Sequence, residues 1–251
     1  MKNKFLLLGI ALVSLTACKT SSLQVSNVQA SKNISINNEL KNDEEFVKVI
    51  TPYKERLDKE MGQKISHTNV DLTKQGDNSN LGALLADFTF DGANIWSKAN
   101  LNQEVDAALI NIGGIRTTIG KGDITLKSVF EVMPFENEVI IVKMKGSDLD
   151  GLFQYYSKTQ VNNPVSHLYI ETNNGVVTQK LINGKEVDPN KVYYIATSDY
   201  LALGGDNMKF FLKGESVPTG IKLRELFIEY FKKTPEVVPS NDIRLKFIGK
   251  K

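Results

Sequence analysis

The sequence predicts a mixed α+β domain in one piece, in which helices flank a mixed β-sheet. Segments with apolar residues at helical spacing alternate along the chain with short runs typical of strands. The Asn183-Gly184 dipeptide is a typical hairpin turn, so some neighbouring strands are expected to pair antiparallel. The 251 residues, 41% hydrophobic and 24% charged, are also enough to bury a substantial core.

The expected elements follow from periodicity and capping signals. A first amphipathic helix is predicted from Asp43 to Met61, kinked or restarted at Pro52 and ended by Gly62. A second helix follows Asn80 as its cap, and a third opens near Thr125. The last two helices are predicted at Ser147–Ser157 and Leu223–Lys233, and the strands at Ala107–Ile110, Glu138–Met144, Leu168–Glu171, Val176–Ile182, Val192–Thr197 and Ile243–Phe247. No internal repeat is visible.

The N-terminus has the pattern of an export signal. Residues 1–4 are basic, Phe5–Val13 is apolar, and Leu15-Thr16-Ala17 precedes Cys18, the only cysteine. This arrangement resembles a bacterial lipoprotein signal, which implies that residues 1–17 are removed and that Cys18 is lipidated. An ordinary signal peptide with a chance cysteine is the alternative. We expect residues 18–42, rich in Ser, Asn and Lys, to be a flexible tether and residues 43–251 to be the folded domain.

Charge and hydropathy exclude several classes of protein. Lys and Arg number 31 against 29 Asp and Glu, and removal of residues 1–17 takes away only Lys2 and Lys4, leaving 29 of each sign. We therefore expect no nucleic-acid partner. The N-terminal apolar stretch is too short to span a bilayer, so membrane attachment would be through the lipid, and we expect the protein in the cell envelope, facing the periplasm or the exterior. A single cysteine also allows no disulfide within the chain.

One glycine-rich segment is a candidate anion site. Asn111 is followed by Ile112, then by Gly113 and Gly114, and Arg116 comes two residues later, all directly after a predicted buried strand. Glycines permit positive φ values, which would turn successive N–H groups into a nest for an anion, and the arginine adds donors suited to phosphate. The alternative is a plain turn with a surface arginine. The segment is not a P-loop, because its spacing is wrong and Gly122 replaces the hydroxyl residue.

Other motifs are weaker singly. Tyr200 precedes the Gly204-Gly205-Asp206 turn, and Phe135 and Asn137 follow Pro134. Each segment could be an ordinary turn or a core aromatic residue. The two histidines, His67 and His167, lie outside metal-site spacings, and we expect structural or surface roles for them. No Gly-x-Ser-x-Gly elbow is present, so no catalytic centre is predicted in this chain.

Taken together and in order, these motifs resemble the C-terminal, substrate-binding domain of the 5′-nucleotidase family, which includes UDP-sugar hydrolases and 2′,3′-cyclic phosphodiesterases. The resemblance covers roughly residues 45–248. It is carried by Thr51-Pro52-Tyr53-Lys54, Met61-Gly62, Asn80-Leu81-Gly82, Asn111–Arg116, Gly122-Asp123-Ile124-Thr125, Pro134-Phe135, Gly146, Asn183-Gly184 and Gly204-Gly205-Asp206.

The resemblance implies roles for individual residues. Arg116 would bind substrate phosphate, with Asn111 beside phosphate and ribose. Phe135 and Tyr200 would sandwich the base, and each stack is worth about 1–3 kcal/mol. Asp206 would accept from the ribose hydroxyls, and Asn137 would contact the base edge. Gly113, Gly114 and Gly205, which lie in the same motifs, complete the predicted substrate-binding residues.

Departures from the family pattern are informative. Gln75, beside Lys74, replaces an expected second phosphate-binding arginine, and Tyr200 replaces a phenylalanine. The family's two-metal catalytic domain has no counterpart in the short segment before the first helix. We therefore expect no cofactor in this chain, with divalent metal ions in a separate metallophosphoesterase subunit.

The predicted function is the nucleotide-binding half of a split 5′-nucleotidase, a hydrolase of nucleotide catabolism, inactive alone and attached to the outer membrane or another envelope membrane. The alternative is a non-catalytic nucleotide- or nucleoside-binding lipoprotein, and a purely structural role is the third hypothesis.

Overall fold

The computed structural model describes residues 25–37 and 40–250. The predicted signal peptide, the lipidation site Cys18 and part of the predicted tether lie outside these residues. The chain divides at Lys48 into two units, and the described residues before Glu44 form no helix or strand. Among the described residues, no helix is both long and apolar enough to cross a bilayer.

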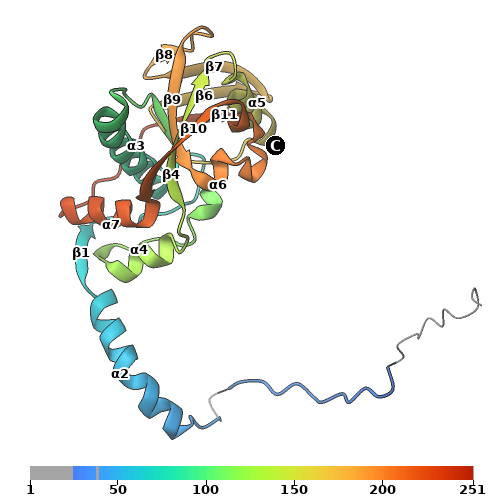
Figure 1. Cartoon of the computed structure of the whole chain (residues 1–251), viewed down its shortest axis with the longest axis vertical. Coiled ribbons are helices and arrows are strands. Elements are labelled where there is room, and N and C mark those ends of the chain that lie inside the picture. Colours follow the sequence, from blue (N-terminus) through green and yellow to red (C-terminus); the bar gives the residue numbers. More distant parts are fainter. Residues whose placement is uncertain (1–24, 38–39, 251) are drawn as a thin grey trace, which may run out of the picture. The chain divides into compact units, whose positions relative to one another are not determined.

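A five-stranded mixed sheet is the centre of the second unit (Figure 1). Only β2 and β9 pair in parallel; the other neighbours are antiparallel. The strands run in the order β10 (Glu215–Lys222), β4 (Glu138–Lys145), β9 (Val192–Ser198), β2 (Ala107–Leu109) and β5 (Val165–Ser166). The predicted mixed α+β class is therefore confirmed.

The remaining strands form two smaller sheets, whereas the sequence predicted a single sheet. One pairs β1 (Lys64–Thr68) with β3 (Gly122–Thr125). The other runs β11 (Leu245–Ile248), β6 (Leu168–Asn173), β7 (Val176–Ile182) and β8 (Lys185–Glu186), with β11 parallel to β6. Asn183 and Gly184, both at positive φ, make the predicted hairpin turn between β7 and β8.

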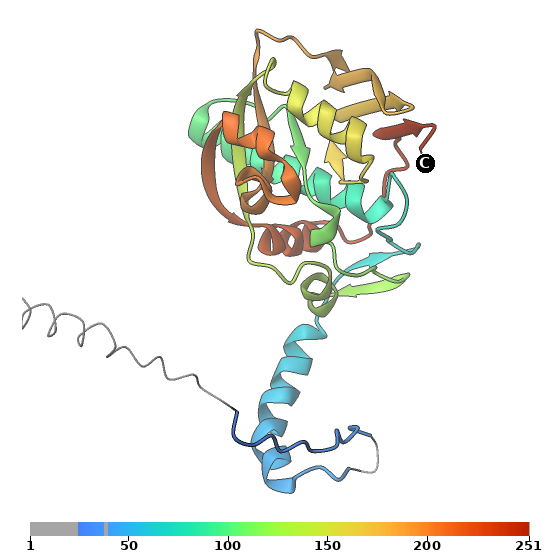
Figure 2. The same cartoon turned by 90° about the vertical axis from the view of Figure 1, so that its right-hand side faces the viewer.

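Strand alternation divides the core into two apolar clusters, one on each face of the central sheet. Ala108, Val139 and Ile141 face the first cluster, which α3 (Asn80–Leu101) and α7 (Leu223–Lys233) cover. The intervening residues face the second cluster, which contains α5 (Asp150–Thr159) and α6 (Asp199–Ala202). Figures 1 and 2 show these helix pairs on opposite sides of β4 and β9.

The first predicted helix forms as α2 (Glu44–Met61), with Pro52 inside it. The Asp43 carboxylate accepts hydrogen bonds from the backbone N–H groups of Glu45 and Phe46, at 2.9 and 3.3 Å, and so caps its first turn. Gly62 follows the helix; its N–H donates to the Asp58 carbonyl at 2.9 Å, and a Cβ there would lie 2.9 Å from the same oxygen, so the position favours glycine. No residue of α2 is buried, although its apolar residues recur at helical spacing.

Several predicted boundaries shift by a few residues. Ser79, not Asn80, caps α3, and its hydroxyl accepts from Gly82 N at 3.2 Å. Asn80 instead joins Thr73 N and the Asp71 carbonyl through its side chain. The helix α4 (Leu126–Val132) begins after Thr125 with a capping box, as predicted. The helix α5 starts three residues later than predicted and β11 two residues later, whereas α7 has its predicted bounds.

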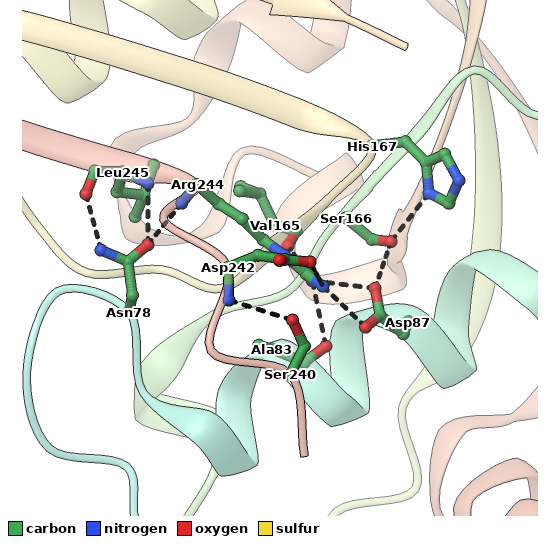
Figure 3. A network of polar contacts seen from close by, with 10 residues as sticks. All are labelled: Asn78, Ala83, Asp87, Val165, Ser166, His167, Ser240, Asp242, Arg244 and Leu245. Atoms are coloured by element: carbon green, nitrogen blue, oxygen red, sulfur yellow. Dashed lines mark hydrogen bonds and ion pairs between the residues drawn. The ribbon is translucent and has the colours of Figure 1, made fainter. Parts of the chain in front are cut away.

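A polar network joins α3 to the segment before β11 (Figure 3). Arg244 makes two 2.8 Å bonds to the Asp87 carboxylate, and Ser166 Oγ donates to Asp87 at 2.5 Å. His167 Nδ1 lies 3.0 Å from Ser166 Oγ, and the imidazole stacks on Phe90 with the ring centroids 3.6 Å apart. His167 is thus an exposed residue whose ring packs on α3; the sequence predicted a structural or surface role for it.

Candidate functional site

One edge of the central sheet gathers the sequence motifs. Because β2 and β9 are parallel and β4 is antiparallel to β9, the ends of β2 and β9 lie beside the start of β4. The segments 111–116, 199–206 and 133–137 leave or enter the sheet at this edge. Three stretches that are far apart in sequence are thereby brought together.

A cavity of about 350 Å³ lies at this edge, within the range of small-molecule sites. Seven of the nine residues predicted to bind substrate line it, and they are Asn111, Gly113, Arg116, Phe135, Asn137, Tyr200 and Asp206. Phe135 and Tyr200 are each 44% exposed, which is unusual for large aromatic side chains unless they serve a surface site. Gly114 and Gly205 do not line the cavity.

The predicted glycine nest is wrong. Neither Gly113 nor Gly114 has a positive φ; both lie in the 3₁₀ turn η1 (Ile112–Gly114), where Gly114 N donates to the Asn111 carbonyl at 3.0 Å. A Cβ at Gly114 would lie 3.1 Å from Asn111 Oδ1, so this glycine makes room for the asparagine side chain. The capacity to bind an anion therefore depends on side chains rather than on a backbone nest.

Arg116 is the cation of this cavity. Its backbone N–H donates to the Val132 carbonyl at 2.9 Å, and its guanidinium donates to the Gly113 carbonyl at 3.2 Å and lies 5.8 Å from the centre of the Phe135 ring. No carboxylate of the described chain pairs with it. Its remaining donors are available to an anionic group on a ligand.

Tyr200 and Asp206 form a linked pair on the cavity wall. The Tyr200 hydroxyl donates to Asp206 Oδ1 at 2.7 Å and accepts from Asp206 N at 3.2 Å, and the hydrogen bond to the carboxylate raises the pKa of Tyr200. Asp206 has φ 50°, a left-handed conformation that these bonds hold in place. Gly205 is required by close approach, since a Cβ there would lie 2.6 Å from the Tyr200 ring.

The aromatic wall is also fixed from behind. Asn137 Nδ2 and Tyr200 N both donate to Asp199 Oδ1 at 2.7 Å, which ties the two sides of the cavity together. Arg224 of α7 donates to the Pro134 carbonyl at 3.1 Å and forms an ion pair with Glu136. The loop that carries Phe135 is therefore attached to a helix of the core.

Gln75 is exposed and does not line the cavity. Its neighbour Lys74 donates to the Ile115 carbonyl at 2.7 Å, directly before Arg116. The lysine thus supports the loop that carries the cation.

Sequence reasoning missed Asp199 and Arg224, which position the site without lining it. Asp199 follows Ser198, the N-cap of α6, and an acid at that position is a signal for a helix start. Arg224 lies in α7 and no motif marks it.

The described residues contain no group of three or more His, Cys, Asp or Glu side chains that could hold a metal ion. His67 Nδ1 lies 2.8 Å from Asp123 Oδ1, without a third such ligand. The cavity therefore offers two aromatic faces, a carboxylate, amide groups and a guanidinium, which suit a planar ring joined to a polyol and an anion.

A family model described as the 5′-nucleotidase C-terminal domain matches residues 60–213. The chain belongs to this family. It is 29% identical over 215 residues to Protein UshA of Yersinia enterocolitica, covering 81% of this chain and 37% of that protein. It is 27% identical over 187 residues to the 5′-nucleotidase of Vibrio vulnificus, covering 70% of this chain and 32% of that protein.

Solved structures agree with this placement. The 5′-nucleotidase precursor of Thermus thermophilus matches with a TM-score of 0.68 and 26% identity, over 83% of this chain and 44% of that one. The structure of a protein from Staphylococcus aureus that is described as a putative 5′-nucleotidase has a TM-score of 0.65 at 13% identity, over 85% of this chain and 45% of that one, and so shares the fold. The chain spans about a third of the curated relatives named above. What it shares with these hydrolases is their C-terminal domain.

Proposed function

We propose that this chain is the nucleotide-binding half of a split 5′-nucleotidase, with the catalytic phosphoesterase domain on a separate chain. The observation that carries the proposal is the shared cavity of Phe135, Tyr200, Asp206 and Arg116 at one sheet edge. The base stacks between the two aromatic rings, Asp206 accepts from the ribose hydroxyls, and Arg116 binds phosphate.

The two-metal centre of the family does not fit the side chains described here, because they contain no suitable cluster. When bound in a catalytic domain, divalent metal ions would supply activated water and charge stabilisation. This chain would bind and orient the nucleotide, and positioning alone can contribute a large part of a rate enhancement.

Phosphate release from AMP tests the split arrangement. The purified chain is mixed with candidate metallophosphoesterase chains encoded beside it, in the presence of Mn²⁺. The proposal requires stimulation over either chain alone, and the Arg116→Ala variant should reduce it. No stimulation by any such partner would contradict the split arrangement.

One observation favours the alternative, a non-catalytic nucleotide-binding lipoprotein. The cation, the carboxylate and both aromatic faces come from this one chain, so the cavity needs no second domain to bind a base. Calorimetry separates the two functions: a receptor binds adenosine or AMP with micromolar Kd or tighter without a partner, whereas a half-site binds weakly until the catalytic chain is added.

The proposed location is the cell envelope, with the protein attached through a lipid on Cys18. Cys18→Ser is expected to abolish acylation and to move the protein to the soluble fraction, because a lipid chain would supply the anchoring energy. Fractionation with metabolic lipid labelling measures both effects. Retention of the variant in washed membranes would contradict lipid anchoring.

A further inference from the structure

A second and larger cavity adjoins the first. It encloses about 810 Å³, and both cavities are lined by Gly113 and Asp206. Its other walls come from α5, from the turns η2 (Gly205–Asn207) and η3 (Lys209–Lys213), and from Ile112, Val161 and Asn163. A ligand that fills the first cavity can therefore extend past Asp206 into the second without leaving the protein surface.

The second cavity carries positive charge. Lys158 of α5 and Lys209 of η3 both line it, and neither has an ion pair or hydrogen bond within the described chain. Asp206, the acid on the shared wall, accepts from the Tyr200 hydroxyl and keeps its negative charge, so the charged lining residues, Lys158, Lys209 and Asp206, have a net charge of 2 − 1 = +1. Two exposed lysine side chains without an ion pair, both lining one cavity, favour an anionic ligand.

A fixed polar framework supports the same cavity. Asn163 is 1% exposed; its Oδ1 accepts from Ile112 N at 2.9 Å and its Nδ2 donates to Tyr155 Oη at 3.3 Å. Tyr155 also has a side-chain hydrogen bond with Thr159, and both residues line the cavity. Burial raises the pKa of Tyr155 and the hydrogen bond with Asn163 opposes this shift, while the negative charge of Asp206 adds to it; the phenol is a protonated donor at neutral pH.

We propose that the second cavity binds a phosphate attached to the 2′ or 3′ oxygen of the nucleotide ribose. This inference rests on the proposed function: with the base between Phe135 and Tyr200, one ribose hydroxyl donates to Asp206, and a phosphate on the other ribose oxygen enters the second cavity. Lys158, Lys209 and Tyr155 then donate to the phosphate. The ligand class is a nucleoside 3′,5′-bisphosphate or a 5′-phosphorylated dinucleotide.

Calorimetry on the purified full chain tests this with AMP, adenosine 3′,5′-bisphosphate and the dinucleotide pApA. The bisphosphate is expected to bind on the order of tenfold tighter than AMP, the gain from charged hydrogen bonds. In the Lys158→Gln/Lys209→Gln variant this affinity ratio should approach one. The matched Lys185→Gln/Lys232→Gln variant removes the same charge from exposed positions outside the cavity and should keep the wild-type ratio.

The dinucleotide pApA shows whether the second cavity accepts a terminal phosphate or a phosphate that joins a second nucleoside. If a second nucleoside occupies the cavity, pApA binds tighter than the bisphosphate, and Gln154→Trp, which fills the cavity from an exposed position on α5, removes that excess. If pApA gains nothing, the site takes a terminal phosphate.

Equal binding of AMP and both larger ligands, or a gain that survives the double lysine variant, would overturn the second site while leaving the proposed function intact. Failure of AMP to bind, both to the chain alone and to the chain mixed with its catalytic partner, would overturn the proposed function and this inference with it.

Discussion

Removing a side chain from the aromatic end or from the cationic end of the cavity is expected to change the affinities for adenosine and AMP in different ways. Phe135→Ala removes one stacking face, so adenosine and AMP should both lose about 1–3 kcal/mol of binding free energy. Calorimetry with both ligands measures the loss. An effect confined to AMP would show that the ring does not contact the base.

Arg116→Ala removes the guanidinium that faces the cavity without a carboxylate partner. AMP should lose about 1.5–3 kcal/mol, the scale of hydrogen bonds to charged groups, whereas adenosine should bind as before. Arg56→Ala, on the exposed face of α2, is the matched control and should change neither ligand. Equal losses for AMP and adenosine would place the phosphate elsewhere.

The Tyr200 hydroxyl acts through Asp206, so its removal should weaken the binding of ligands that carry ribose hydroxyls. Tyr200→Phe keeps the stacking ring but frees Asp206, which then holds its left-handed conformation less firmly. Adenosine affinity should fall by about 0.5–1.5 kcal/mol, the net worth of a hydrogen bond. The affinity of 2′,3′-dideoxyadenosine, which has no hydroxyls for Asp206, should change little, and a similar loss for both ligands would assign the hydroxyl to the base instead.

At the scale of elements, the start of η2 packs closely against Tyr200 of α6 at Gly205. Gly205→Ala would place a Cβ 2.6 Å from the Tyr200 ring and its carbonyl, and backbone cannot yield as a flexible side chain does. We expect unfolding free energy to fall by about 1–3 kcal/mol, together with loss of ligand stacking. Gly120→Ala, where nothing lies within 4 Å, is the control for chemical denaturation and binding, and similar behaviour of the two variants would contradict the packing argument.

Elements with strong local signals could be predicted from the sequence, and those set by long-range pairing could not. In α7, the apolar stripe and the basic residues of the last turn are enough to predict the helix without any long-range contact. By contrast, β10 contains Pro218 and Gly220, which argue against a strand, and it forms because it is an edge strand paired only to β4. The strand β1 has an irregular register against β3, and β5 has two residues. Neither carries a period long enough to recognise.

The same difference between local signals and long-range contacts explains which residues of the site could be predicted. Residues that line the cavity lie in motifs and were predicted, while their supports, such as Arg224, become visible only when α7 packs beside the Phe135 loop. The prediction of an anion nest at Gly113 and Gly114 was wrong because glycine can adopt a positive φ but does not have to. There the glycine at 114 serves the Asn111 side chain.

At the scale of the whole molecule, the Asp87–Arg244 pair joins α3 to the last strand (Figure 3). The Arg244 side chain is only 14% exposed, so Asp87→Ala would leave its charge poorly solvated. We expect a loss of about 1.5–3 kcal/mol in urea unfolding, as for hydrogen bonds to a charged group. The exposed Arg56–Glu60 pair is the control, since Glu60→Ala should cost no more than about 0.5 kcal/mol. Equal costs would mean that burial contributes nothing at Arg244.

His167 beside this network predicts how stability depends on pH. Burial lowers the pKa of His167 below its ordinary 6.5, and the positive charge of Arg244 acts in the same direction, while Asp87 and Asp91 oppose the shift. A histidine whose pKa is lower in the folded protein than in the unfolded chain stabilises the folded state when its ring is neutral, because the folded state binds the proton more weakly. Its contribution is therefore present above pH 6.5 and is lost as the pH falls through 6.5 toward the folded pKa.

The measurement is a comparison of urea midpoints at pH 7.5 and 5.5, with a lower midpoint expected at the acid value. His167→Asn should reduce this difference, because asparagine accepts the positive φ of 57° at this position without a titrating ring. Since the chain has two histidines, the His67→Asn variant leaves one imidazole resonance, and an NMR titration of it reports the pKa of His167 directly. Asp91→Asn should lower that pKa further by removing an opposing charge. A His167 pKa above 6.5 would reverse the sign of the predicted pH dependence.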